Sequence, residues 1–131
     1  MKPKRIWANL SSKNLQRTNE FYSALGFKSN NPHNSQELTS FFFGENDFII
    51  HFFTEERFNT DINGIKANAN GNEIIFSLSA ESKEEVDGWV EKVEKAGGSV
   101  YTPPTAIGKG YTFGFSDPDG HKFNILYWPK N

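Results

Sequence analysis

Two polar residues interrupt apolar runs in this chain, and both have side chains suited to ligand binding. His51 lies within Phe48-Ile-Ile-His-Phe-Phe53, and Asn124 lies within Phe123-Asn-Ile-Leu-Tyr127. An imidazole exchanges protons near neutral pH because its reference pKa is about 6.5, whereas an amide only donates and accepts hydrogen bonds. His51 is either a ligand contact or proton-transfer group, or a buried histidine hydrogen-bonded to backbone. Asn124 either touches a ligand or satisfies backbone groups at the end of a strand.

The two positions are equivalent members of a pattern that the chain carries twice, from residue 5 to 54 and from residue 73 to 128. Each half begins with a short apolar strand, Arg5–Leu10 or Glu73–Leu78, and continues into an amphipathic segment that ends at glycine. Each half closes on the strand that holds His51 or Asn124. Two duplicated modules placed side by side can enclose a cavity, so we expect the functional site between them.

Helix signals agree with this duplication. Asn14 can cap a first helix that closes at Gly26. Ser82 and Glu85 have the spacing of a capping box, which predicts a second helix up to Gly97. Both segments carry one apolar stripe, so each helix should pack on one face of a sheet. The remaining strands are predicted at residues 27–29, 37–43 and 47–53, and at 99–101, 111–115 and 122–128. Each half therefore reads β-α-β-β-β, with residues 1–54 and 73–131 as modules and 55–72 as a linker.

The alternation of side chains along a strand predicts which residues face the cavity. The apolar sets predicted to pack on the helices are Ile6, Ala8 and Leu10 in the first half and Ile74, Phe76 and Leu78 in the second. The residues predicted to contact a ligand on the other face are Trp7, Asn9, Ile49, His51, Phe53, Ser77 and Asn124. His33, in a polar loop, and His121, after a tight turn, are predicted to be solvated surface residues.

Composition excludes several classes of partner. The chain has 131 residues, a formal net charge of -2 and no cysteine. A weakly acidic protein is not drawn to nucleic acid or to an anionic membrane, so neither is an expected partner. Without cysteine there is no disulfide and no thiolate metal site, which together with the lack of an apolar N-terminal stretch makes a cytoplasmic location the expectation. Thirteen phenylalanines suit either an apolar pocket or a Phe-rich core.

Two longer motifs extend the interpretation to a family. The helix phrase Asn14-Leu-Gln-Arg-Thr-Asn-Glu-Phe-Tyr-Ser-Ala-Leu-Gly-Phe27 and the closing phrase Gly114-Phe-Ser-Asp-Pro-Asp-Gly-His-Lys-Phe-Asn-Ile-Leu126 resemble the vicinal oxygen chelate superfamily. That superfamily includes glyoxalase I, bleomycin-resistance proteins and extradiol dioxygenases. The resemblance implies an α+β fold in which two β-α-β-β-β modules form a curved mixed sheet around a cavity, with the helices on the outer face. It also implies a single glyoxalase-like domain over residues 1–131.

The resemblance also indicates which positions would hold a metal ion. Metal-dependent members of the family place ligands at four positions, and matched position by position these are Trp7, His51, Ile75 and Asn124 here. Trp and Ile cannot bind a metal ion, and an amide oxygen is a weak ligand where the family usually has Glu. We therefore predict no catalytic metal, and no cofactor, in this chain.

Three functions from different classes remain open. The first is a binding protein of the bleomycin-resistance type that holds a small apolar or aromatic molecule. The second is a glyoxalase-like lyase or isomerase in which His51 is an acid, a base or a metal ligand. The third is a ligand-sensing module without chemistry. The family resemblance also implies a homodimer, for which Phe41–Phe43 or Tyr127–Trp128 could supply a shared face or could equally belong to the core.

Overall fold

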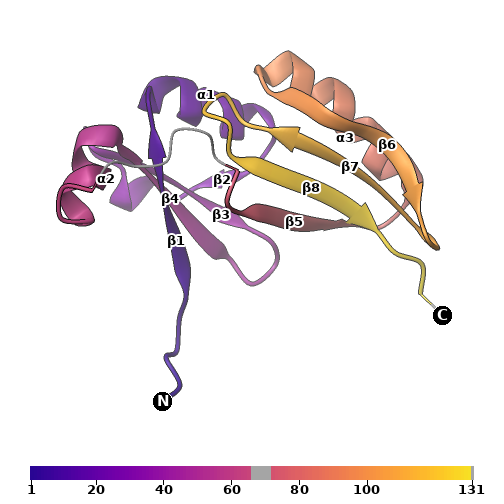
Figure 1. Ribbon diagram of the computed structural model, residues 1–131, viewed down its shortest axis with the longest axis horizontal. Helices are drawn as coiled ribbons and strands as arrows, with labels where there is room; N and C mark the ends of the chain where they lie inside the picture. Colours follow the sequence, from indigo (N-terminus) through magenta and orange to yellow (C-terminus); the bar gives the residue numbers. More distant parts are fainter. Residues whose placement is uncertain (66–71, 131) are drawn as a thin grey trace. The chain divides into compact units, whose positions relative to one another are not determined.

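The computed structural model describes residues 1–65 and 72–130, and the chain divides into two compact units, Met1–Asn68 and Ala69–Asn131. The first unit contains β1 (Trp7–Ser12), α1 (Leu15–Ala24), β2 (Lys28–Ser29), the short 3-10 helix η1 (Asn31–His33), β3 (Leu38–Phe43), β4 (Phe48–Thr54) and α2 (Glu55–Asp61). The second contains β5 (Ile75–Ala80), α3 (Lys83–Ala96), β6 (Ser99–Ile107), β7 (Gly110–Ser116) and β8 (Lys122–Tyr127). The predicted α+β class and its two β-α-β-β-β modules are confirmed (Figure 1).

Each unit has an open four-stranded mixed sheet with the same order of strands. The orders are β1-β4-β3-β2 and β5-β8-β7-β6. The first strand of each module runs parallel to the last, and the other neighbours are antiparallel. The strand carrying His51 is therefore central in its sheet, as is the strand carrying Asn124. The cavity predicted between the two modules stays a prediction.

The two long helices begin and end where their sequences predict. The Asn14 side chain accepts a hydrogen bond from the Arg17 amide at 3.0 Å, and the Ser82 hydroxyl accepts one from the Glu85 amide at 3.1 Å. These bonds satisfy amides in the first helical turn that have no partner within the helix. At the end of α3, Gly97 adopts a left-handed conformation with a φ of 101°, which costs glycine little.

One face of each sheet is covered by a helix and forms an aromatic core. In the first unit Tyr22 of α1 stacks on Phe52 of β4 with ring centroids 4.7 Å apart. In the second, Phe115 and Phe123 stack at 5.2 Å beneath α3, which lies along this face (Figure 1). Phe41 and Phe43 are also core residues, at 0% and 4% exposure, so they do not form the exposed face that the sequence left open.

Both first strands begin two residues later than predicted. Ile6 and Ile74 therefore precede β1 and β5, and they are 80% and 51% exposed instead of packing on the helices. A shift of two residues preserves side-chain parity, because alternate residues share a face. Ala8 still pairs with buried Ile50 on the helix-covered face, and the opposite face keeps its predicted residues.

The segment predicted as a linker is partly helical. Its first residues form α2, whose N-terminus is capped by the Thr54 hydroxyl accepting from the Arg57 amide at 3.3 Å. Residues 66–71 of this predicted linker lie outside the described residues. None of the helices in the described part of the chain has the length and apolar character that crossing a membrane requires.

Candidate functional site

The open face of the first sheet carries His51 at its centre. Ile50 and Phe52 point to the helix-covered core, so His51 lies on the opposite face together with Ile49 and Phe53. His51 pairs with Asn9 of β1 on one side and with Ser40 of β3 on the other. His51 is therefore held between two neighbouring strands, which fixes the position of its backbone.

A pocket of about 220 Å³ lies beside this imidazole. Its lining residues are Arg5, Trp7, Asn30, His33, Ile49 and His51. The Nδ1 atom of His51 is buried and has no hydrogen-bond partner among the described residues. A buried polar atom without a partner is costly in a folded protein, and such an atom is expected to find its partner in a bound molecule or water.

His33 is exposed, as predicted, and it also lines this pocket. The rings of His33 and His51 have centroids 6.3 Å apart. Burial, and secondarily the charge of His33, lower the pKa of His51 below its usual value of 6.5. His51 is therefore neutral at pH 7 and able to accept a proton.

The loop that carries His33 is anchored to the sheet by buried polar contacts. Asn30, at 6% exposure, donates from its backbone amide to the Ser40 carbonyl at 2.8 Å and from its side chain to the Ser40 hydroxyl at 3.3 Å. The Ser40 amide donates in turn to the Asn34 side chain at 3.1 Å. These bonds hold η1 against β3, so His33 is positioned by the same sheet as His51.

An adjoining pocket of about 380 Å³ extends the open face towards the β3–β4 turn. It shares Arg5, Trp7 and Ile49 with the first pocket, and its other lining residues are Lys4, Ile6, Phe42, Asn46, Asp47 and Phe48. Trp7 is 54% exposed, so its indole is available to a ligand in either pocket. The two pockets together form a surface with an imidazole-rich end and an end where apolar side chains lie beside Lys4, Asn46 and Asp47.

The open face of the second sheet has a neutral centre. Asn124 pairs with Ser77 of β5 and with Gly114 of β7, and its Oδ1 atom is buried without a partner among the described residues. A Cβ atom at Gly114 would lie 2.5 Å from the Tyr101 ring, so glycine is required there. The Tyr101 hydroxyl crosses β7 to donate to the Phe123 carbonyl at 2.9 Å.

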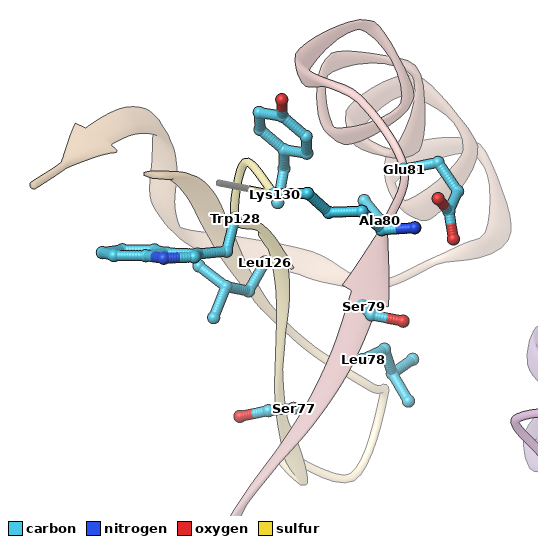
Figure 2. Close-up of a pocket in the computed structure, with 9 residues that line it drawn as sticks. Ser77, Leu78, Ser79, Ala80, Glu81, Leu126, Trp128 and Lys130 are labelled. Carbon is cyan, nitrogen blue, oxygen red and sulfur yellow. The ribbon is translucent and has the colours of Figure 1, made fainter. Parts of the chain in front are cut away.

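A larger pocket, of about 590 Å³, lies at the C-terminal end of this second sheet (Figure 2). Its lining residues are Ser77, Leu78, Ser79, Ala80, Glu81, Leu126, Tyr127, Trp128 and Lys130. The Trp128 indole projects just beyond β8, and the Lys130 ammonium points towards the Ala80 and Glu81 side (Figure 2). A Cβ atom at Gly110 would lie 2.4 Å from Trp128 Cε3, so the β6–β7 hairpin contacts the indole closely.

The predicted ligand-binding residues are distributed over these surfaces. Trp7, Ile49 and His51 line the 220 Å³ pocket. Ser77 lines the 590 Å³ pocket. Asn9 is exposed and lines neither.

The other two predicted residues are placed differently again. Phe53 is buried with the Arg57 guanidinium 5.1 Å from its ring centroid. Asn124 faces open sheet without lining a described pocket. His121 is 9% exposed and donates its backbone amide to Asp117 Oδ1 at 2.9 Å, so the surface position predicted for it is wrong.

Sequence reasoning missed Arg5, Asn30 and His33 as pocket residues. Pro32 in Asn30-Asn-Pro-His33 offered one signal, because proline in the first turn favours a short helical segment over an irregular loop. Arg5 was the first residue of the predicted strand, where alternation places it on the face of Trp7 and Asn9, but the structure has it before β1.

The donor atoms do not fit a resident catalytic metal. Trp7 and Ile75 offer no ligand atom, and Asn124 offers only a neutral oxygen. His33 and His51 supply two imidazoles, one ligand short of the three that catalytic zinc sites take from the protein. Across residues 1–65 and 72–130, no three His, Asp or Glu side chains are grouped so that they could hold a metal ion.

Comparison with known proteins gives consistent results. Residues 6–125 match the model of the Glyoxalase/Bleomycin resistance protein/Dioxygenase superfamily. Among solved structures, a hypothetical protein from S. aureus is 34% identical, with a TM-score of 0.85 over 97% of this chain and 95% of that one. No curated protein matches the chain in sequence.

More distant structures share the fold. A glyoxalase-related enzyme from Fulvimarina pelagi has 19% identity and a TM-score of 0.83 over 98% of this chain and 94% of that one. A fosfomycin resistance protein from Mesorhizobium loti has 15% identity and a TM-score of 0.70 over 98% and 95% of the two chains. The names of these relatives span enzymes and resistance proteins, so the fold alone does not select a function.

Proposed function

Because the chain belongs to the Glyoxalase/Bleomycin resistance protein/Dioxygenase superfamily, we propose that it binds a small apolar or aromatic molecule on its open sheet faces without a catalytic metal. The observation that carries this proposal is the pocket beside His51, which Trp7 and Ile49 also line and where the buried Nδ1 atom has no hydrogen-bond partner among the described residues. Apolar walls with a few fixed polar groups are typical of small-molecule sites. In this proposal residues 1–131 act as one domain.

A ligand screen by thermal unfolding tests this function. A molecule that binds only the native state raises the melting temperature, by a free energy that grows with the ratio of its concentration to its Kd. We expect aromatic compounds to stabilise the native protein and the Trp7→Ala variant to lose that stabilisation. Ile107→Ala is the matched control, since Ile107 is a similarly exposed apolar residue that lines neither pocket at issue. A flat response across the screen would leave a ligand-sensing or interaction module as the better description.

A second candidate is a lyase or isomerase of the glyoxalase type with His51 as general base. The lowered pKa of His51 favours this candidate, since a neutral imidazole beside a pocket can remove a proton from a bound substrate. Activity on glyoxalase-type substrates, lost in His51→Gln and retained in Asn124→Ala, would support it. Metal analysis is the deciding control: stoichiometric metal in the purified protein, lost in His51→Ala, would show that His51 is a ligand and not a base.

The oligomeric state and location follow the family and the composition. We propose a symmetric homodimer, supported by large apolar side chains that remain exposed, among them Trp7, Ile75 and Trp128. Sedimentation at micromolar concentration tests this, and a monomer of 14.9 kDa would count against it. A cytoplasmic location remains a prediction, resting on the lack of cysteine.

A further inference from the structure

The pocket beside His51 has a chemical character that an apolar ligand alone does not use. Three of its lining residues, Arg5, His33 and His51, carry basic nitrogen atoms. Among the described residues that line this pocket, none is acidic. Within the described part of the chain the Arg5 guanidinium has no ion-pair or hydrogen-bond partner, so its donors are available.

We infer that this pocket receives the oxyanion of the bound ligand, a carboxylate or a phosphonate, with Arg5 and His51 as its donors. This inference rests on the proposed small-molecule function and names the class of ligand. An arginine fork is the side chain best matched to a carboxylate or phosphonate, and it stays charged over the whole working range of pH. Asn30, buried and fixed to Ser40, closes the polar end of the pocket.

The size of the pocket limits what it can hold. Its volume of about 220 Å³ is below the roughly 300 to 1,000 Å³ typical of whole-ligand sites. It therefore takes a head group, and the rest of the ligand extends into the adjoining 380 Å³ pocket, which shares Arg5, Trp7 and Ile49. That second pocket adds Phe42 and Phe48, which suit an aromatic body. The expected ligand is an aromatic acid and not a polyanion.

Proton linkage predicts how the binding affinity changes with pH. The charged or titratable groups that line the same pocket as His51 are His33 from η1 and Arg5 from the segment before β1. Lys4 and Asp47 line the adjoining pocket. An oxyanion beside His51 favours the imidazolium, so binding takes up a proton. Affinity should increase as the pH falls from 8 towards 6, whereas a neutral ligand of the same shape should show no such change.

Calorimetric titration with benzoate, phenylphosphonate and benzamide tests the inference. Benzamide has nearly the shape of benzoate without its charge. We expect benzoate or phenylphosphonate to bind roughly tenfold or more tightly than benzamide, the worth of one charge-assisted hydrogen bond. Tighter binding of benzoate would assign a carboxylate, and tighter binding of phenylphosphonate would assign a phosphonate.

Two variants test which residues cause the preference for the anion, and a third variant is a control for the loss of charge. Arg5→Gln and His51→Gln should each lose most of the preference for the anion, and Lys92→Gln should keep it, because Lys92 is an exposed cation on α3. Arg5 is exposed and precedes β1, so its replacement leaves the core intact. Circular dichroism checks that both variants are folded.

The possible failures are distinct. If benzamide binds as tightly as benzoate, or the preference for the anion persists in both variants, the oxyanion site is wrong while the proposed function stands. If none of the three aromatic probes binds and the wider ligand screen is also flat, the proposed function itself is wrong.

Discussion

The two modules share one arrangement of strands but differ in the polar group at the centre of their open faces. His51 pairs with Asn9 in the first sheet, and Asn124 pairs with Ser77 in the second. Both carry a buried polar atom without a partner among the described residues, Nδ1 in one and Oδ1 in the other. The duplication has kept the position of a polar group and changed its chemistry.

The surroundings differ in the same sense. The first face places Arg5 and His33 near the imidazole, so its recognition is ionic and changes with pH. The centre of the second face holds Asn124 and Ser77, which bind without titrating near neutral pH, and its pocket adds the charged residues Glu81 and Lys130. Two copies of one scaffold can therefore supply one surface whose central group titrates and one whose central group does not, a division that single substitutions can test.

The largest expected effect concerns the cores, where the modules should behave alike. Phe52→Ala and Phe123→Ala each remove a fully buried ring, which costs about 3 to 5 kcal/mol of unfolding free energy. Denaturant unfolding of both variants measures this. Equal losses would support equivalent cores, and a loss below about 1 kcal/mol in either variant would contradict the stacking described for that module.

The next largest effect is a loss of stability in the second module, where the β6–β7 hairpin packs closely on Trp128. Gly110→Ala places a Cβ atom 2.4 Å from Trp128 Cε3 and 2.7 Å from the Tyr127 carbonyl oxygen. Overpacking of this kind costs about 1 to 3 kcal/mol. The matched control is Gly88→Ala, which meets nothing within 4 Å in α3 and should stabilise the protein, by up to about 1 kcal/mol. Thermal unfolding with tryptophan fluorescence reports both stability and the environment of Trp128.

A smaller effect concerns the polar atoms without partners. Asn124→Leu removes a buried amide oxygen that has no hydrogen-bond partner in residues 1–65 and 72–130, so it should raise the unfolding free energy by about 1 kcal/mol. Ser77→Ala, at an exposed position on the neighbouring strand, should change it by less than about 0.5 kcal/mol. Destabilisation by Asn124→Leu in urea unfolding would mean that this oxygen already has a partner.

The smallest expected effect is a pH dependence of stability, to which His51 in the first sheet should contribute and Asn124 in the second should not. The pKa of His51 is lowered in the folded protein, mainly by burial, so the unfolded chain binds more protons below pH 6.5. The contribution of neutral His51 to the free energy of unfolding is therefore complete above pH 6.5. It is lost as the pH falls towards the lowered pKa of His51 in the folded protein. Thermal unfolding from pH 8 to pH 5 should show a shallower decline in His51→Gln and an unchanged one in Asn124→Gln. The same slope in both variants would place the titrating group elsewhere.

Sequence patterns predicted the scaffold well because its signals are local. The caps at Asn14 and Ser82 and the glycine at Gly97 act within one helical turn. The site-facing parity held although both first strands were misplaced, since the error was two residues and not one. The prediction ended one strand too early, at residue 101. The structure continues β6 through Pro103 and Pro104, because β6 is an edge strand, where a missing amide donor is tolerated.

The pocket itself was only partly predictable. His51 interrupts an apolar strand and is visible in the sequence, whereas His33 reaches the pocket only because Asn30 and Asn34 bind Ser40 and fold the loop back on β3. Arg5 enters from an irregular segment before β1. The position of His33 depends on these tertiary contacts, which strand and helix periodicity does not encode.

The most direct test of this account is a histidine NMR titration with benzoate. The chain has three histidines, so the ring signals can be assigned by substituting each in turn. We predict that benzoate shifts the His51 and His33 resonances and raises the pKa of His51, while the buried His121 signal in the second module stays in place. Saturable benzoate binding that moves neither His51 nor His33 would contradict the central claim that ligands are recognised on the open face of the first sheet.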